Sequence, residues 1–343
     1  MMHDVQSTAV DRFHLDDLPL EFKQRFEVVI DCLPDGQHLA LPAVVARGTQ
    51  PGKILLCVGA VHGDEYEGAI AIQDIYEELQ TDAMQGSFLG IPVMNGPAFV
   101  GALREGVWDH LNLARVFPGS ATGSPTLRIA HAFHQHLLPQ ADLLLDIHSG
   151  GNAYAIQHLS GYQLREGEVG RIQRQAAIAF GADVVWGTGG LPGRTLSSAG
   201  QLGIPAIYAE MRGEGRCRAG DLERAKQGIR NVLAYLGIIE GAYPAAPPSY
   251  LVEMPGPGTG HLQADHPSPT SGIFVPAVDV WDWVEAGQII GQIRHPDGTV
   301  LAQVPSARSG RVLFLRTLPR VFAGDTVAFV LPVPKHPAEP VPG

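Results

Sequence analysis

Cysteine and long apolar runs are scarce in this chain of 343 residues. Its three cysteines, Cys32, Cys57 and Cys217, are odd in number and show no C-x-x-C spacing, so we expect reduced thiols and a cytoplasmic protein. No apolar run approaches the roughly 20 residues that span a bilayer. The amino terminus mixes charges and lacks the apolar core of a signal peptide. We therefore expect no membrane partner.

Positive charge is also in short supply. The 24 Lys and Arg residues face 35 Asp and Glu, which gives a formal net charge of −11. Because nucleic-acid binding needs a basic face, we expect no nucleic-acid partner. Hydrophobic residues make up 45% and charged residues 17%, a composition typical of a globular protein. The length favours two domains.

Strand-like and helix-like patterns alternate in the first part of the chain. Predicted strands lie within 26–59, with a turn at 34–36, and at 141–147 and 204–210; predicted helices are 67–79, 124–136 and 221–236. Such alternation predicts an α/β domain over residues 1–240, with a parallel or mixed sheet flanked by helices.

The composition changes after this domain. Residues 241–249 are rich in proline and predict a linker. Residues 250–334 carry short β-like runs with glycine turns, and 271–290 echoes 309–327, since each has S-G, an apolar run and V-x-A-G. Two similar halves predict a small barrel-like β domain.

This internal repeat resembles the biotinyl/lipoyl carrier fold, which would imply a swinging-arm module. Such carriers attach their cofactor to a lysine in an exposed hairpin. The four lysines are Lys23, Lys53, Lys226 and Lys335, so none falls between 251 and 334. The carrier interpretation therefore fails on its chemistry.

Polar residues that could bind a metal follow two of the predicted strands. The apolar run 53–58 leads into His62 and Glu65, and the run in 141–147 leads into His148. The carboxyl ends of strands are where open α/β sheets place their sites. Two histidines and one glutamate form a recognised zinc set that leaves one position open for catalysis. Asp146 could accept the free N–H of a ligating imidazole.

Five segments in order resemble the succinylglutamate desuccinylase/aspartoacylase family, relatives of the zinc carboxypeptidases. The segments are HGDEYEG (62–68), NGPAFVGALREG (95–106), LNLARVFPGS (111–120), LLLDIHSGG (143–151) and IPAIYAEMRGEG (204–215). The resemblance implies a carboxypeptidase-like catalytic domain with one Zn²⁺ per chain. It also implies that Arg104 polarises the scissile carbonyl, that Glu210 is the general base, and that Arg115 and Asn112 serve substrate binding, Asn112 from behind.

One position departs from the family pattern. The family motif N-L-N-R reads Asn112, Leu113, Ala114 and Arg115 here, so the second asparagine is missing. Arg115 therefore lacks its usual partner on a substrate carboxylate. The candidates for a replacement are Arg194, Arg212 and Arg216.

These residues predict a zinc-dependent amidohydrolase that deacylates a small N-acyl amino acid or N-acylated amine. Family members with similar segments at 62–68 and 209–211 include deacetylases of N-acetyl-diaminobutyrate, which favours a small acyl group. Two alternatives stay open: a metallocarboxypeptidase that trims peptides, and a non-catalytic metal-binding protein with the same fold. The apolar edges of the barrel-like domain favour a homo-oligomer.

Overall fold

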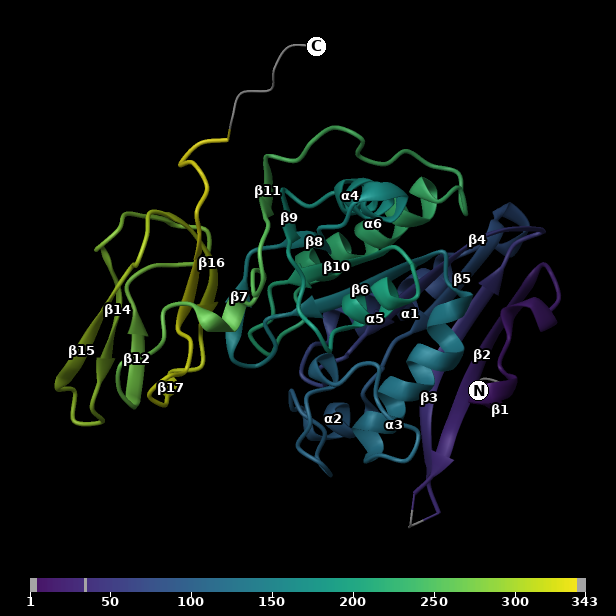
Figure 1. Cartoon of the computed structure of the whole chain (residues 1–343), viewed down its shortest axis with the longest axis horizontal. Coiled ribbons are helices and arrows are strands. Elements are labelled where there is room, and N and C mark those ends of the chain that lie inside the picture. Colours follow the sequence, from purple (N-terminus) through teal and green to yellow (C-terminus); the bar gives the residue numbers. More distant parts are fainter. Residues whose placement is uncertain (1–4, 34–35, 338–343) are drawn as a thin grey trace.

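A ten-stranded sheet, in the order β1-β2-β3-β5-β4-β6-β10-β8-β9-β11, forms the centre of the computed structural model, which describes residues 5–33 and 36–337 (Figure 1). Its strands are β1 (Val5–Ala9), β2 (Phe22–Cys32), β3 (His38–Arg47), β4 (Gln50–Gly59), β5 (Gln85–Ile91), β6 (Leu143–Ser149), β8 (Leu159–Gln163), β9 (Val184–Thr188), β10 (Ala206–Met211) and β11 (Tyr250–Met254). Strand β10 runs parallel to β6 and antiparallel to β8. The predicted mixed sheet is thus confirmed. The turn predicted at 34–36 falls on residues 34 and 35, outside the described part.

Helices cover both faces of this sheet. They are α1 (Glu67–Glu78), α2 (Gly96–Gly101), α3 (Pro125–Ala132), α4 (Gly167–Phe180), α5 (Thr195–Gln201) and α6 (Ala219–Tyr235). The three predicted helices correspond to α1, α3 and α6, and α3 continues into one turn of π-helix, η5 (Phe133–Leu137). Within residues 5–33 and 36–337, no helix combines the length and apolarity needed to cross a bilayer.

The spacing of apolar residues explains why α1 forms and which way it faces. Ile72, Ile75 and Tyr76 share one side of the helix and are 0–3% exposed. Glu77 and Glu78 on the other side meet solvent and pair with Arg25 and with cations of α6. These apolar side chains pack α1 against the sheet, and the helix begins directly after the loop that carries His62.

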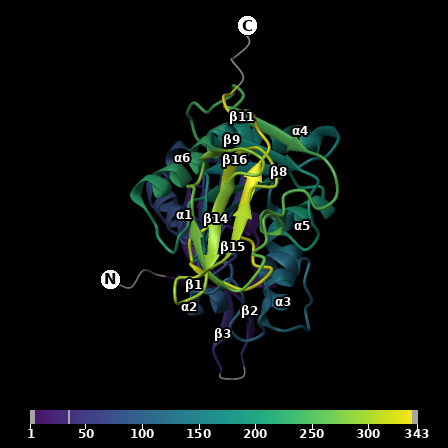
Figure 2. The ribbon, with the colours of Figure 1, turned by 90° about the vertical axis from the view of Figure 1, so that its left-hand side faces the viewer.

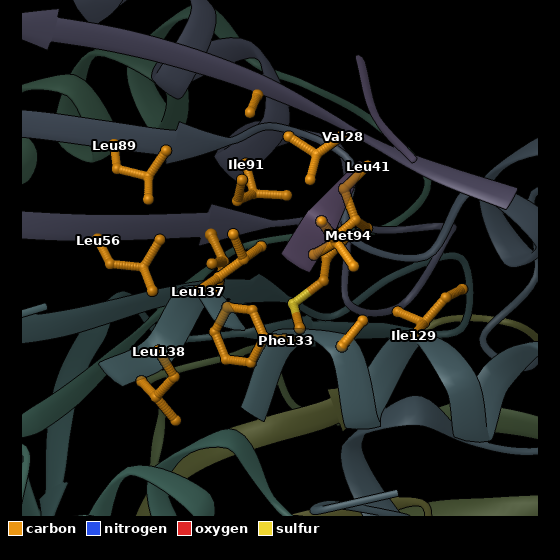
Figure 3. Close-up of a cluster of buried hydrophobic side chains, with 14 of the residues drawn as sticks. Val28, Leu41, Leu56, Leu89, Ile91, Met94, Ile129, Phe133, Leu137 and Leu138 are labelled. Atoms are coloured by element: carbon orange, nitrogen blue, oxygen red, sulfur yellow. The ribbon is translucent and has the colours of Figure 1, made fainter. Parts of the chain in front are cut away.

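Alternating side chains of the central strands build two separate cores. In β4, Leu55 and Cys57 pack on the face covered by α1, α4 and α6. Leu56 and Val58 pack on the opposite face, against α3 and η5. Figure 3 shows this second core, where Phe133 and its neighbours from η5 lie against side chains of the strands. The period of two in a strand thus makes three layers.

Two antiparallel sheets lie in the C-terminal part of the chain, and the short strand β7 (Tyr154–Ile156) pairs with β16 (Gly310–Arg316) in one of them. One contains β15 (Val300–Pro305), β14 (Ile289–Arg294), β12 (Gly272–Pro276) and β17 (Arg320–Val321); the other contains β13 (Trp283–Val284), β16 and β18 (Ala328–Leu331). Both contribute to one core, and Figure 2 shows β14 and β15 in front of the larger sheet. The extra β region expected from sequence is therefore present.

The predicted repeat is visible in the hydrogen bonds of these sheets. Ser271 accepts the backbone N–H of Ala323, and Ser309 accepts that of Ala286, so the equivalent serine of each half binds the V-x-A-G turn of the other. The exchange indicates pseudo-two-fold symmetry. The boundary between the two predicted domains is less simple, because β11 extends the large sheet beside β9, and β7 pairs with β16. The division at 241–249 stays a prediction.

The second core predicts the cost of removing its largest ring. Phe133 is 0% exposed, so Phe133→Ala should lower the free energy of unfolding by about 3–5 kcal/mol, measured by urea denaturation. The control is Phe322→Ala, because Phe322 is 57% exposed and its loss should change stability by about 0.5 kcal/mol or less. Equal losses in the two variants would contradict the layer assignment.

Candidate metal centre and active site

The second core ends in polar residues at the carboxyl ends of β6 and β10. Along one face of β6, buried Leu144 is followed by Asp146 and then His148. The neighbouring strand places Glu210 in register with His148, so both side chains leave the sheet on the same side. Strand β4 lies on the other side of β6 and leads into the loop that carries His62. Three adjacent strands thus deliver the candidate residues to one place.

Glu65 lies between the two histidines predicted as metal ligands. Its carboxylate oxygens are 2.7 Å from Nδ1 of His62 and 2.8 Å from Nδ1 of His148. The backbone N–H of Ser149 donates to the same carboxylate at 3.1 Å. Glu65 is 2% exposed, and the ligand atoms of the three side chains all lie within 4.8 Å of one another. Across residues 5–33 and 36–337, this is the single cluster of three such groups.

The second ring nitrogen of each histidine, Nε2, contacts a polar side chain on the side away from Glu65. Nε2 of His148 lies 3.0 Å from Oδ2 of Asp146. Nε2 of His62 lies 3.1 Å from Oδ1 of Asn112, which also accepts the backbone N–H of Ala114 at 2.9 Å. Both Nδ1 atoms therefore face inward with fixed ring orientations. Asn112 has the supporting position expected from the sequence.

The charged groups of the cluster shift one another's pKa values. Burial alone would raise the pKa of Glu65, but the two imidazoles and their hydrogen bonds hold it well below its usual value. Burial would lower the pKa of His148, yet Asp146 and Glu65 raise it well above the ordinary value. For His62, burial and the nearby charge of Arg104 lower the pKa to about 4.

This donor set fits a divalent metal ion. Two inward-facing imidazole nitrogens and a carboxylate are the ligands of a His₂Glu centre, and zinc commonly takes such a set with one position left open. Ligating histidines usually give their second nitrogen to a carboxylate or carbonyl oxygen, as both do here. Cobalt, manganese or nickel can occupy the same set, so the geometry by itself does not select among them.

Arg104 reaches the cluster from the segment after α2. Its Nη1 donates to Glu65 at 3.2 Å, while a third of the side chain stays open to the cleft. Asn95 starts α2 by accepting the N–H of Ala98, and Asn152 donates to the carbonyl of Ala102 at its end. These contacts hold the segment against the cluster.

Glu210 lines the same cleft from β10, the strand next to β6. Its Oε2 is buried and has no hydrogen-bond partner among the described residues. Burial raises the pKa of Glu210 to about 8, against the opposing charges of His148 and the arginines. A carboxyl group without a partner beside a metal-binding cluster is well suited to bind a water molecule or to exchange a proton with a ligand.

The cleft in front of these residues has a volume of about 880 Å³, its open mouth included. The cleft is lined by the cluster with Arg104 and Glu210, and also by Gln163, Arg194 and the segment Gly260–Gln263. That last segment follows β11, so the region after the predicted linker helps to enclose the cleft. Its His261 was not singled out from the sequence, where nothing marks it.

Two guanidinium groups in the cleft have no acidic partner within residues 5–33 and 36–337. Among the described residues Arg115 donates only to the carbonyl of Ala114, and Arg194 approaches only the carbonyl of Gly260, at 3.5 Å. Burial, with the charges of Arg194 and Arg104, lowers the pKa of Arg115 to about 10. The wall therefore carries unpaired positive charge, which suits an anionic ligand.

The other two candidates for the missing clamp lie elsewhere. Arg212 forms ion pairs with Glu214 and Asp279, and neither it nor Arg216 lines the cleft. Of the three replacements considered for the absent asparagine, Arg194 is thus the one that the fold brings beside Arg115. A Cβ at Gly193 would lie 2.3 Å from the carbonyl oxygen of Arg115, so only glycine allows this approach.

Two supporting contacts near the first motif were not predicted from the sequence. Asp64, inside the first motif, accepts the N–H of Asn152 at 2.9 Å and joins the two ligand loops. Glu67 accepts the N–H of Gly213 at 3.1 Å and joins α1 to the end of β10. Their position beside His62 and Glu65 could have indicated these contacts, since acidic residues at a buried strand end need hydrogen-bond partners.

Comparisons with known proteins agree with this fold. The model of the succinylglutamate desuccinylase/aspartoacylase catalytic domain matches residues 51–236. N-alpha-acetyl-L-2,4-diaminobutyric acid deacetylase of Halomonas elongata is 33% identical over 297 residues, which cover 84% of each chain. The product-bound ectoine utilization protein EutE (DoeB) of Ruegeria pomeroyi has a TM-score of 0.81 and 27% identity, covering 91% of this chain and 97% of the other.

A second solved structure, a succinylglutamate desuccinylase/aspartoacylase from Rhodobacter sphaeroides, has a TM-score of 0.79 and 28% identity, covering 90% of this chain and 94% of that one. With the fold, these matches define an amide-cleaving hydrolase of the deacylase class. The chain belongs to the succinylglutamate desuccinylase/aspartoacylase family, as its five motifs predict.

Removing one member of the cluster should abolish metal binding. His148→Ala takes away one of three ligands, so we expect less than about a tenth of the metal content of the unaltered protein, measured by elemental analysis after zinc loading and dialysis. The matched control is His131→Ala, which removes a histidine of α3 outside the cluster and should leave the content unchanged. Equal metal content in both variants would show that the ion binds elsewhere.

Proposed function

We propose that this protein is a zinc-dependent deacylase that hydrolyses the amide bond of a small N-acyl amino acid. The observation that carries the proposal is the convergence of His62, Glu65 and His148 in one cleft with Glu210 and Arg104. One metal ion would be held by the three clustered side chains. When bound, such an ion supplies a Lewis acid that activates water at neutral pH and polarises a carbonyl group.

The other residues have distinct tasks in this proposal. Glu210 acts in its carboxylate form, which the charge of a bound divalent ion would favour against the effect of burial on its pKa. It takes a proton from the attacking water and passes it to the leaving nitrogen, and its oxygen without a partner among the described residues supports this task. Arg104 carries a permanent charge that stabilises the oxygen of the cleaved carbonyl as negative charge develops there. Asp146 and Asn112 keep the two imidazoles in orientation. No covalent intermediate is required.

The amine half of the substrate would be held through a carboxylate. Arg115 and Arg194 line the same cleft and have no acidic partner in the described part of the chain, and guanidinium groups are strong hydrogen-bond donors to a carboxylate. Arg194 would thus replace the asparagine that is absent at Ala114. The Halomonas relative is a deacetylase of N-alpha-acetyl-L-2,4-diaminobutyric acid, so a short acyl group on the α-nitrogen of a small amino acid is the first substrate to test.

The rival interpretations make different demands. A peptide-trimming metallocarboxypeptidase needs an open groove, whereas here Gly260–Gln263, from the region after the predicted linker, forms part of the lining of the cleft. A non-catalytic metal-binding protein has no need of a buried, unpartnered Glu210. The homo-oligomer and the cytoplasmic location stay predictions.

The decisive test separates metal binding from turnover. We expect purified, zinc-loaded protein to release acetate from N-acetyl amino acids, including the diaminobutyrate derivative, and to lose this activity with a chelator. Glu210→Gln should keep its zinc but lower kcat by about 10²–10⁴-fold, because the proton acceptor is gone. Glu214→Gln, an equivalent change at an ion-paired position outside the cleft, should retain activity.

Two outcomes would overturn this assignment. Cleavage of peptides without cleavage of N-acyl amino acids would make the protein a carboxypeptidase. Zinc bound at one ion per chain without any hydrolysis would make it a metal-binding protein.

The carboxylate grip makes a separate prediction. Arg194→Gln should lower kcat/KM about 100-fold for an N-acetyl amino acid and leave it nearly unchanged for the matching amino-acid amide, because only the first presents a charge to the guanidinium. Adding Ala114→Asn to Arg194→Gln should recover part of the loss. Arg212→Gln is the control, since that side chain is paired outside the cleft. Equal losses on acid and amide would refute the grip.

A further inference from the structure

The first residue of α5 touches the support of the metal centre. Thr195 is 2% exposed, and its hydroxyl donates to Oδ2 of Asp146. The same oxygen lies 3.0 Å from Nε2 of His148. A hydroxyl, a carboxylate and an imidazole therefore form a line that ends at the cluster.

The hydroxyl matters because the carboxylate has little else to hold it. Asp146 is fully buried, and its Oδ1 has no hydrogen-bond partner in the described part of the chain. Rotation of a carboxylate about its last bond is broad and roughly two-fold, so an unheld Asp146 could turn either oxygen toward His148. The donated hydrogen bond selects one orientation and thereby one direction for the ring.

The start of α5 is itself held firmly. Ser198, one turn after Thr195, lies 2.7 Å from Nδ1 of the buried His134 in η5. The backbone N–H of Arg194 donates to Ser197 at 2.9 Å, and the N–H of Phe117 donates to the carbonyl of Gly193 at 3.1 Å. Thr195 is therefore attached to a braced segment that can keep its hydroxyl in place.

We propose that Thr195 is a positioning residue, whose hydroxyl orients Asp146 and through it His148 for metal binding. The inference rests on the proposed function, because it assumes that the cluster holds a metal ion. Thr195 is not one of the three candidate ligands, and its effect on the cluster passes through Asp146. Direct partners of ligating histidines commonly change metal affinity by about 10–100-fold when removed, so Thr195, one contact further out, should act at the low end of that range.

Three variants test the hydroxyl itself. Thr195→Val keeps the shape of the side chain and removes the donor, whereas Thr195→Ser keeps the donor. The matched control is Thr126→Val, because Thr126 is equally buried and its hydroxyl donates to Asp109, at 2.8 Å, away from the cluster. Zinc affinity is measured by competition with a chromogenic chelator. The visible absorption of the cobalt-substituted proteins reports the ligand geometry.

We expect Thr195→Val to bind zinc about 10-fold more weakly and to alter the cobalt bands, with Thr195→Ser close to the unaltered protein. Thr126→Val should lose thermal stability but keep zinc affinity within about twofold, because its hydroxyl bond is purely structural. This pattern would assign the loss to the hydroxyl of Thr195.

Other patterns would overturn the inference. Unchanged affinity in Thr195→Val, or an equal loss in Thr195→Ser, would show that the hydroxyl does not orient the centre. If the unaltered protein binds one zinc and deacylates its substrate in that case, only the role of Thr195 is wrong. If the unaltered protein binds no zinc, the proposed function fails with it.

Discussion

A carboxylate buried between two imidazoles is the constraint on which the rest of this structure depends. Glu65 is 2% exposed, and a buried charge is tolerated only when partners surround it. Those partners come from a loop, a strand end and the segment after α2, as His62, His148 and Arg104. The strands β4, β6 and β10 therefore have to keep their register, since a slip of one residue would turn His148 toward the other core.

The same alternation that stabilises the fold also distributes the chemistry. On β6, Leu143, Leu145 and Ile147 pack against the helices of one face, while Leu144 supports the other face just before Asp146 begins the site. The guanidinium groups of Arg115 and Arg194 line the same cleft, so it contains both the buried carboxylate of the cluster and two cations.

Much of the fold and of the site could be predicted because the signals are local. A buried strand followed by polar residues identified His62, Glu65 and His148, and apolar spacing identified α1, α3 and α6. Elements with weaker patterns, such as the short helix α5, were not predicted. The place of β11 at the edge of the large sheet also escaped, because pairing with β9 joins segments about 65 residues apart and leaves no local mark.

Short patterns of side chains were enough to identify the layered α/β class, the family and the three residues of the cluster. The packed fold was needed to show that Arg194 lies beside Arg115, that His261 lines the cleft and that Thr195 supports Asp146 across 49 residues. The physical reason is that orientation and pairing of buried polar groups depend on neighbours supplied by packing, which no stretch of chain encodes alone.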